Sequence, residues 1–195
     1  MDKRRSDTRE RIRTVAIELF AERGYETTSL REIAERLGVT KAALYYHFRT
    51  KEDIVASLIE DLRRGIDDIV QWAESAPPGQ ARAEQIITRY GTLLHDLGRD
   101  VIQFWAENQS ALREIGVGAS LRIQFRVLAD LMTGPDHTPI AVFHARQALL
   151  AISWSLSMMG DLDLSDEDSY TAATRISLDI ATRISPASPN AHIAR

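Results

Sequence analysis

The sequence predicts an all-α protein with a small N-terminal three-helix domain and a larger C-terminal helical domain. Apolar residues recur at helical spacing along almost the whole chain. No stretch of useful length alternates apolar and polar residues as a half-buried strand would. Breaks that contain Gly or Pro separate the apolar segments. Three of these segments begin after a Ser or Asp that has an acidic residue three positions further along the chain, which is the pattern of a helix N-terminus.

The first predicted helix starts after Asp7, which with Glu10 has the arrangement of a capping box. Gly24 follows the helix, where a left-handed residue costs least. Its apolar stripe has positions i, i+3, i+4, i+7 and i+8, the pattern of an amphipathic helix, and consists of Ile12, Val15, Ala16, Leu19 and Phe20.

Two short helices are predicted next, with a tight turn at Gly38 between them. Ser29 and Thr40 are good N-caps for these helices, while small Ala34 allows them to cross closely and Leu44 packs the second on the first. The spacing predicts a helix-turn-helix motif over residues 29–48. An ordinary αα-hairpin of a helical bundle shares the same pattern.

Charge and surface chemistry favour a nucleic-acid partner for this motif. Residues 1–51 contain 12 Lys or Arg against 8 Asp or Glu, a net charge of +4, whereas the whole chain has −4. A basic end on an acidic body indicates local contact with a polyanion, although chance clustering on a solvated face gives the same count. The second short helix has an outer face rich in donors and aromatic rings, which suits a DNA major groove: Thr40, Lys41, Tyr45, Tyr46 and His47.

The stretch from Thr8 to Glu60 resembles the tetracycline-repressor (TetR) family, chiefly in the blocks LFAERGYETTSLREIAERLGV and LYYHFRTKED. The resemblance implies a homodimeric transcriptional repressor that is released from a palindromic double-stranded DNA operator by a small-molecule effector. It implies a DNA-binding domain at residues 1–52 and an effector-binding and dimerisation domain at residues 53–195. The positions expected at the DNA are Thr28, Ser29, Thr40, Lys41, Ala42, Tyr45, Tyr46, His47 and Lys51.

Chemistry divides the work among these positions. Lys41 can donate to a guanine edge or to a phosphate, and Ala42 and the Thr40 methyl can meet a thymine methyl. Contacts to the DNA backbone, which set the register of the protein on the duplex without reading its sequence, are expected from Thr28, Tyr45, His47 and Lys51. Arg4 and Arg5 have two interpretations, an arm that reaches a minor groove or a disordered basic tail.

Helices are expected in the C-terminal domain over about 80–97, 100–114, 117–133, 136–160 and 166–185, the last opened by Ser165 with Asp168. The last two contain many small residues, which allow close helix approach. The resemblance implies that these two helices form the dimer interface, and burial within one subunit is the alternative.

Aromatic and Met residues of this domain are candidates for an effector pocket. Core packing is the favoured explanation for each aromatic taken singly, so the pocket is implied mainly by the resemblance. Such a lining suits a moderately apolar molecule, aromatic or cationic. The candidates are Trp72, Tyr90, His95, Phe104, Trp105, Phe125, Trp154 and Met158.

Other classes of function find no support in the sequence. The chain has no cysteine, and His137 and His144 lie two helical turns apart, too far to share a metal, so neither metal nor cofactor is expected. No catalytic motif occurs, and an enzyme is not expected. Without a signal peptide or a membrane span, a cytoplasmic protein is expected. A constitutive architectural DNA-binding protein without an effector is the alternative function.

Overall fold

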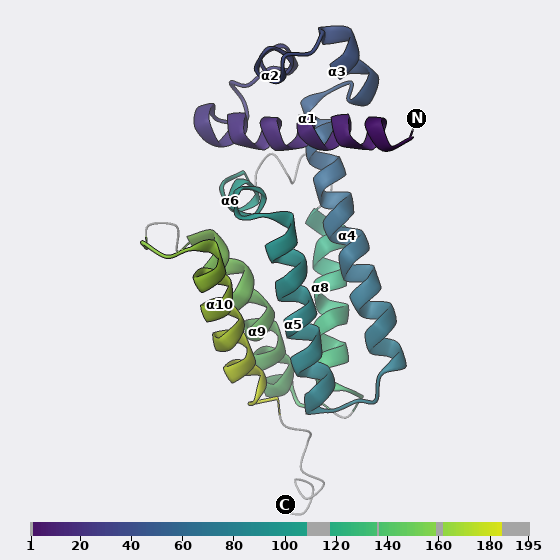
Figure 1. Ribbon diagram of the computed structural model, residues 1–195. Helices are drawn as coiled ribbons and strands as arrows, with labels where there is room; N and C mark the ends of the chain where they lie inside the picture. The colour runs from purple at the N-terminus through teal and green to yellow at the C-terminus, as the bar shows by residue number, and fades with distance from the viewer. Residues whose placement is uncertain (1, 109–117, 136, 159–161, 185–195) are drawn as a thin grey trace, which may run out of the picture.

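The computed structural model describes residues 2–108, 118–135, 137–158 and 162–184, and every regular element in these ranges is an α-helix (Figure 1). Three helices form a head at one end of the molecule: α1 (Asp2–Arg23), α2 (Leu30–Leu37) and α3 (Lys41–His47). The helices of the body in these ranges are α4 (Lys51–Ser75), α5 (Gln80–Leu97), α6 (Arg99–Glu107), α8 (Gly118–Thr133), α9 (Pro139–Met158) and α10 (Asp166–Ala181). The predicted all-α fold is confirmed.

Helix α1 begins earlier than the sequence pattern indicated. It starts at Asp2, so Asp7 lies inside the helix and the predicted capping box at Asp7 is wrong. The physical reason is that residues 2–6 contain neither Gly nor Pro and nothing ends the helix there. Its other end is as expected, because Gly24 has a φ of 91° and its N–H donates to the Phe20 carbonyl.

The body helices match the predicted segments, and apart from the C-terminal end of α6 the ends that the structure describes lie within a few residues of the predicted ones. Helix α9 begins at Pro139, since proline fits the first turn of a helix, and Ser165 caps α10 by accepting from the Asp168 N–H. Helix α6 ends at Glu107, with Asn108 as its C-cap. The remaining predicted helical residues 109–114, 117, 136, 159, 160 and 185 lie outside the described residues. No helix in the described ranges is long and apolar enough to span a membrane.

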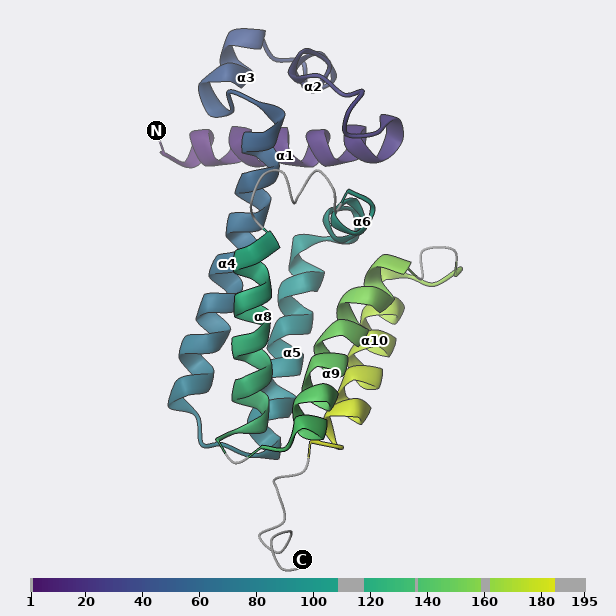
Figure 2. The same cartoon turned by 180° about the vertical axis from the view of Figure 1, so that it is seen from behind.

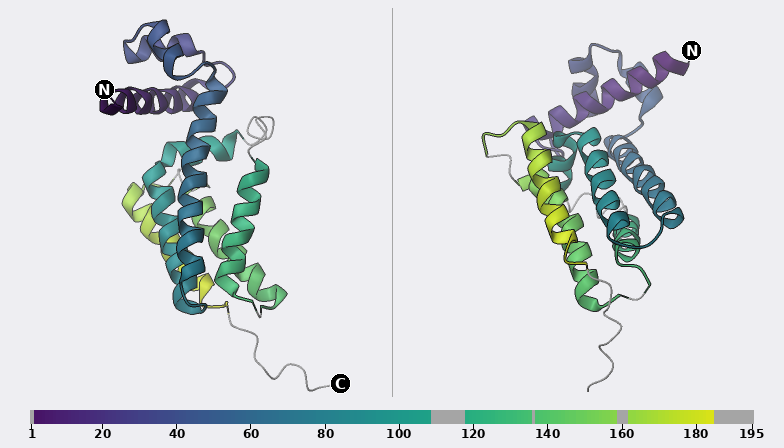
Figure 3. Two further views of the ribbon diagram at one scale, coloured as in Figure 1. Left: turned by 90° about the vertical axis from the view of Figure 1, so that its right-hand side faces the viewer. Right: turned by 60° about the horizontal axis from the view of Figure 1, so that its bottom comes forward.

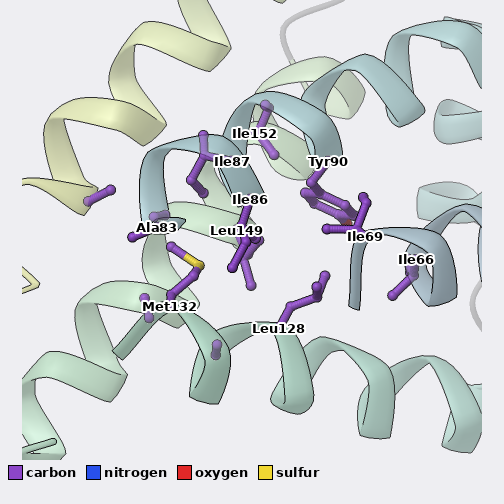
Figure 4. Close-up of a cluster of buried hydrophobic side chains, with 14 of the residues drawn as sticks. Ile66, Ile69, Ala83, Ile86, Ile87, Tyr90, Leu128, Met132, Leu149 and Ile152 are labelled. Carbon is purple, nitrogen blue, oxygen red and sulfur yellow. The ribbon is translucent and has the colours of Figure 1, made fainter. Parts of the chain in front are cut away.

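Buried side chains form two clusters. The head cluster contains residues of α1–α3 and of α4 up to Ile59, together with Val101 and Phe104 of α6. The body cluster begins at Leu62 of α4 and joins α4, α5, α8, α9 and α10, as Figure 4 shows for its central residues. Helix α4 therefore belongs to both clusters, and the predicted domain boundary at residues 52/53 lies within its first turn.

Helices α9 and α10 lie side by side at one edge of the body (Figures 1 and 2). Helix α5 approaches them closely at Gly91, where a Cβ atom would lie 2.6 Å from Ile152 Cδ1. A side chain at this position would force the Ile152 side chain to shift, so the glycine favours the close approach of α5 to α9. Two further views also place the head at one end of the molecule (Figure 3).

Candidate nucleic-acid interface

Helix α2 begins at a complete capping box. Ser29 Oγ accepts from the Glu32 N–H at 3.3 Å, and the Glu32 carboxylate accepts from the Ser29 N–H at 2.8 Å. That backbone hydrogen bond is the largest cause of the lowered pKa of Glu32. The predicted start of the helix is confirmed, and Ser29 itself remains at the surface.

The turn between α2 and α3 depends on the backbone of Gly38. Its φ and ψ are 71° and 28°, in the left-handed region, and a Cβ atom there would meet nothing within 4 Å. The requirement is therefore conformational and not steric. The Val39 N–H donates to the Ala34 carbonyl across the turn, and Thr40 then caps α3 by accepting from the Ala43 N–H.

Helix α3 is anchored on its inner side and exposed on its outer side. Leu44 and Phe48 are buried in the head cluster. The outer side lies at the end of the molecule remote from the body (Figure 1), and Tyr46 is 67% exposed. The Lys41 ammonium lies 5.3 Å from the centre of the Tyr45 ring. The predicted DNA-facing residues at the surface of α3 and its cap are Thr40, Lys41, Ala42, Tyr45 and Tyr46, with His47 half-buried.

Lys51 is held by the loop after α1. Its ammonium donates to the carbonyls of Tyr25 at 2.7 Å and Glu26 at 3.1 Å, and lies 4.4 Å from the centre of the Tyr25 ring. These contacts fix the first turn of α4 against the head. An ammonium has three donors, so one remains for a phosphate at the N-terminus of α4.

Thr28 lies away from the exposed face. It is 2% exposed, and its hydroxyl donates to the carbonyls of Gly24 at 2.8 Å and Leu19 at 3.3 Å. A DNA contact from Thr28 would have to use its main chain.

Arg4 and Arg5 belong to helix α1, so the interpretation as a disordered tail does not describe their backbone.

Tyr25 was not singled out from the sequence, yet it organises the interface from behind. Its ring lies 5.0 Å from Phe20 and 5.7 Å from Phe104, and its hydroxyl donates to Glu52 at 3.0 Å. Burial, followed by the hydrogen bond to Glu52, raises the pKa of the phenol. An aromatic residue directly after a helix-ending glycine was the available signal.

The body contains a cavity of about 230 Å³ between α4, α5, α6 and α9. It brings together three of the eight candidate effector residues, Tyr90, Trp105 and Trp154. Its described lining is completed by Leu62, Leu94, Ile102, Ala106, Ser153 and Ser157.

The other candidates lie elsewhere. Phe104 stacks on Phe20 in the head cluster, at 5.4 Å between ring centres. Trp72 lies under the Arg89 guanidinium, and Phe125 packs on the body cluster. His95 lines a separate cavity of about 200 Å³ and contacts the Tyr170 ring. Met158 ends α9, and its side chain lies outside the described residues.

Comparisons with known proteins agree with this geometry. The family model for bacterial regulatory proteins of the tetR family matches residues 12–58, which include all of α2 and α3. The transcriptional regulator AcrR of Shigella flexneri is 37% identical over 73 residues, which are 37% of this chain and only 34% of AcrR. The regulator TtgR of Pseudomonas putida is 26% identical over 182 residues, covering 80% of this chain and 87% of TtgR.

Solved structures extend the likeness to the body. The crystal structure of AmtR from Mycobacterium smegmatis matches this structure with a TM-score of 0.64 and 24% sequence identity. The match covers 89% of this chain and 85% of AmtR, so the two proteins share the fold. The named relatives are transcriptional regulators, which agrees with the prediction that the chain is not an enzyme. The head therefore matches the model of the tetR family over residues 12–58, and the chain as a whole is similar to DNA-binding transcriptional regulators of that family.

Proposed function

We propose that this protein is a homodimeric repressor that binds a palindromic operator and releases it when a small molecule occupies the body. The observation that carries the proposal is the outer face of α3, with exposed donors and aromatic rings on a helix anchored from behind by Leu44 and Phe48. Only a helix fixed in this way can present side chains to a major groove in one register.

The residues at the start of α3 read bases in this proposal. Lys41 donates to a guanine edge, and Ala42 and Thr40 contact thymine methyl groups. Tyr45, His47 and Lys51 bind phosphates and set the register of the head on the duplex. Tyr46 and Ser29 complete the contact surface.

Exposed apolar side chains support dimerisation through α9 and α10. Ile140 and Phe143 of α9 and Ile176 of α10 are each at least half exposed, although their helices otherwise pack within the body. A single half-site offers few contacts, and a two-fold dimer links two of them at high effective concentration.

We expect the Phe143→Glu variant to be monomeric and to bind operator DNA at least tenfold more weakly, because a charge would be buried at the interface. Analytical ultracentrifugation and fluorescence anisotropy measure the two effects. Ile123→Glu is the matched control, since Ile123 is similarly exposed but lies on α8. A dimeric Phe143→Glu variant would contradict this interface.

The position of the cavity supports regulation by an effector. It is lined by Ile102, Trp105 and Ala106 of α6, the helix that also contributes Val101 and Phe104 to the head cluster. A ligand that moves α6 would shift the heads relative to half-sites about 34–36 Å apart. A body without a cavity would have favoured the architectural alternative.

The first test is binding of the purified protein to the DNA upstream of its own gene, by fluorescence anisotropy with random DNA as the control. Sequence-selective binding by a dimer supports the proposal. Equal affinity for both DNAs would contradict the proposal that the protein recognises an operator in this DNA. An operator affinity that no bound small molecule changes would contradict the proposal that an effector releases the DNA.

A further inference from the structure

The positive side chains of the head fall into two groups. Some are already neutralised by carboxylates: Arg23 binds Glu32 at 3.1 Å, and Arg36 binds Glu22 at 2.6 Å. A cation without a carboxylate partner keeps its full charge for a DNA phosphate. In residues 7–51, the part of the head whose side chains the structure describes, the cations without such a partner are Arg9, Arg11, Lys41, Arg49 and Lys51.

Arg9 differs from the others because it comes from α1 and lies over the end of α3. Its side chain is exposed, and its guanidinium carbon lies 4.9 Å from the centre of the Phe48 ring. Phe48 is the C-cap of α3 and is buried in the head cluster. His47 precedes Phe48 and Lys51 follows it by three residues, and both are proposed to bind phosphates. Arg9 therefore brings an additional cation to this region of the head.

The sequence of α1 leaves Arg9 in a positive local field. The nearest acidic residue, Glu10, pairs with Arg13 at 3.2 Å, and Arg13 also pairs with Asp61 of α4. Side chains three and four residues apart are neighbours on a helix surface. None of these positions around Arg9 is acidic, since they are Arg5, Ser6, Ile12 and Arg13.

The contact with Phe48 fixes the guanidinium without using its hydrogen-bond donors. A guanidinium is planar, and its five N–H donors point outward in that plane. A group that lies over an aromatic ring can therefore still donate two parallel hydrogen bonds to one phosphate. Because the ring restricts the side chain in advance, less conformational entropy is lost when DNA binds.

We propose that Arg9 binds a DNA phosphate and that the Phe48 ring holds it in position for this contact. This proposal rests on the proposed function and extends the DNA-binding surface beyond the helix-turn-helix to α1. In Figures 1 and 2 the N-terminal half of α1 extends past α4 on the same side as α3. A phosphate carries no sequence information, so Arg9 strengthens binding to operator and random DNA alike.

The salt dependence of binding to a random DNA duplex tests the proposal on the full-length protein. Arg9→Gln should reduce the magnitude of the slope of log affinity against log salt concentration by about 0.9 for each phosphate that Arg9 binds. Between about 50 and 200 mM salt, the affinity ratio of wild type to variant should then shrink about 3.5-fold for each such phosphate. Fluorescence anisotropy measures both quantities.

Arg36→Gln is the matched control. Arg36 is also an exposed arginine of the head, but Glu22 already neutralises it, so its loss should leave the slope unchanged.

Two further variants separate phosphate binding from simple shielding of the Phe48 ring. Arg9→Met keeps a hydrocarbon chain over the ring and should lose as much slope as Arg9→Gln, because both lack the charge. Arg9→Lys keeps the charge and should retain most of the slope, with a lower affinity because an ammonium does not form the bidentate contact. Thermal unfolding of each variant confirms that it is folded.

The proposal is overturned if Arg9→Gln keeps the wild-type slope, if Arg36→Gln loses as much slope, or if Arg9→Lys behaves like Arg9→Gln. A shielding role alone would lower the unfolding temperature of Arg9→Gln and leave the slope intact. Equal wild-type affinity for operator and random DNA would contradict only the sequence-specific repressor, because the slopes are measured on random DNA. A wild-type protein that binds neither DNA would overturn both proposals.

Discussion

Side chains on α3 divide into a buried set that packs in the head cluster and an exposed set that faces away from it. Leu44 and Phe48 are buried and set the position of the helix. Lys41 and Tyr45 lie one turn apart on the exposed side, where the ammonium contacts the ring. A change at either exposed residue should therefore alter DNA binding and leave the free energy of unfolding almost unchanged.

Tyr45→Ala should weaken binding to operator and random DNA by a similar factor, about 1 kcal/mol for each half-site, because its proposed contact is to a phosphate. Lys41→Ala should reduce the discrimination between them by about 1–3 kcal/mol, if Lys41 binds a guanine. Anisotropy titrations with both DNAs measure the difference. Equal effects of the two substitutions on discrimination would contradict the assigned roles.

Tyr25→Phe should lower stability in a pH-dependent way. Partial burial raises the pKa of Glu52, but hydrogen bonds from its own backbone N–H and from the hydroxyls of Tyr25 and Thr50 lower it overall. A carboxyl with a lowered folded-state pKa stabilises the fold above its unfolded value of about 4.3 and loses this contribution as the pH falls through the folded value.

The Tyr25→Phe variant should therefore lose about 1 kcal/mol of unfolding free energy at pH 7 and less below about pH 4. Urea unfolding at both pH values measures this difference. Phe retains the ring that packs on Phe20 and Phe104, so only the hydroxyl is tested. A loss that is the same at both pH values would contradict the role of Glu52.

Helices α2 and α3 form one unit because local residues cap the C-terminus of α2 and the N-terminus of α3. Thr40 caps α3, and Gly38 takes the left-handed backbone that ends α2. The geometry of DNA reading therefore depends on a turn in which few side chains take part.

Gly38→Ala should cost about 1–2 kcal/mol of unfolding free energy and weaken DNA binding, because a Cβ disfavours the left-handed region. Gly38→Asn should cost less, since Asn tolerates that region better. Gly79→Ala is a matched control in the body, with φ of 141° and also no atom near its Cβ position. It should lower stability without a specific loss of DNA affinity, and an equal loss of affinity in both variants would contradict the role of the turn.

At the scale of the whole molecule, charge is divided between the ends. Residues 1–51 have a net charge of +4, which leaves −8 on the rest of the chain. The acidic body disfavours indiscriminate coating of DNA, and this charge difference supports the head as the proposed surface of contact.

Operator affinity should fall steeply with salt, with a slope of about −0.9 for each phosphate bound in a plot of log affinity against log salt concentration. Lys51→Gln should reduce the magnitude of the slope by about 1 for each phosphate that the lysine binds. Arg122→Gln on α8 is the control, because Arg122 is exposed on the body. A slope that Lys51→Gln leaves unchanged would contradict the binding of a phosphate by Lys51.

Local signals were sufficient for much of the fold. The capping Ser29 and Thr40, the left-handed Gly38 and the periodic apolar positions act within a few residues, so their consequences could be predicted from the sequence and are confirmed. The start of α1 was missed, because a polar segment without a breaker gives no signal of where a helix begins.

Only the tertiary structure decided which residues meet. Phe104 and Trp105 are neighbours in the sequence with similar chemistry, yet one stacks in the head and the other lines the cavity. Thr28 looked available for DNA and is buried. The sequence by itself determined most of the helices and the helix-turn-helix motif that carries the resemblance to the TetR family, because local hydrogen bonding and periodicity encode them. Burial depends on contacts between distant segments, and so the cavity, its uncharged wall and its contact with the head emerged only from the packed helices.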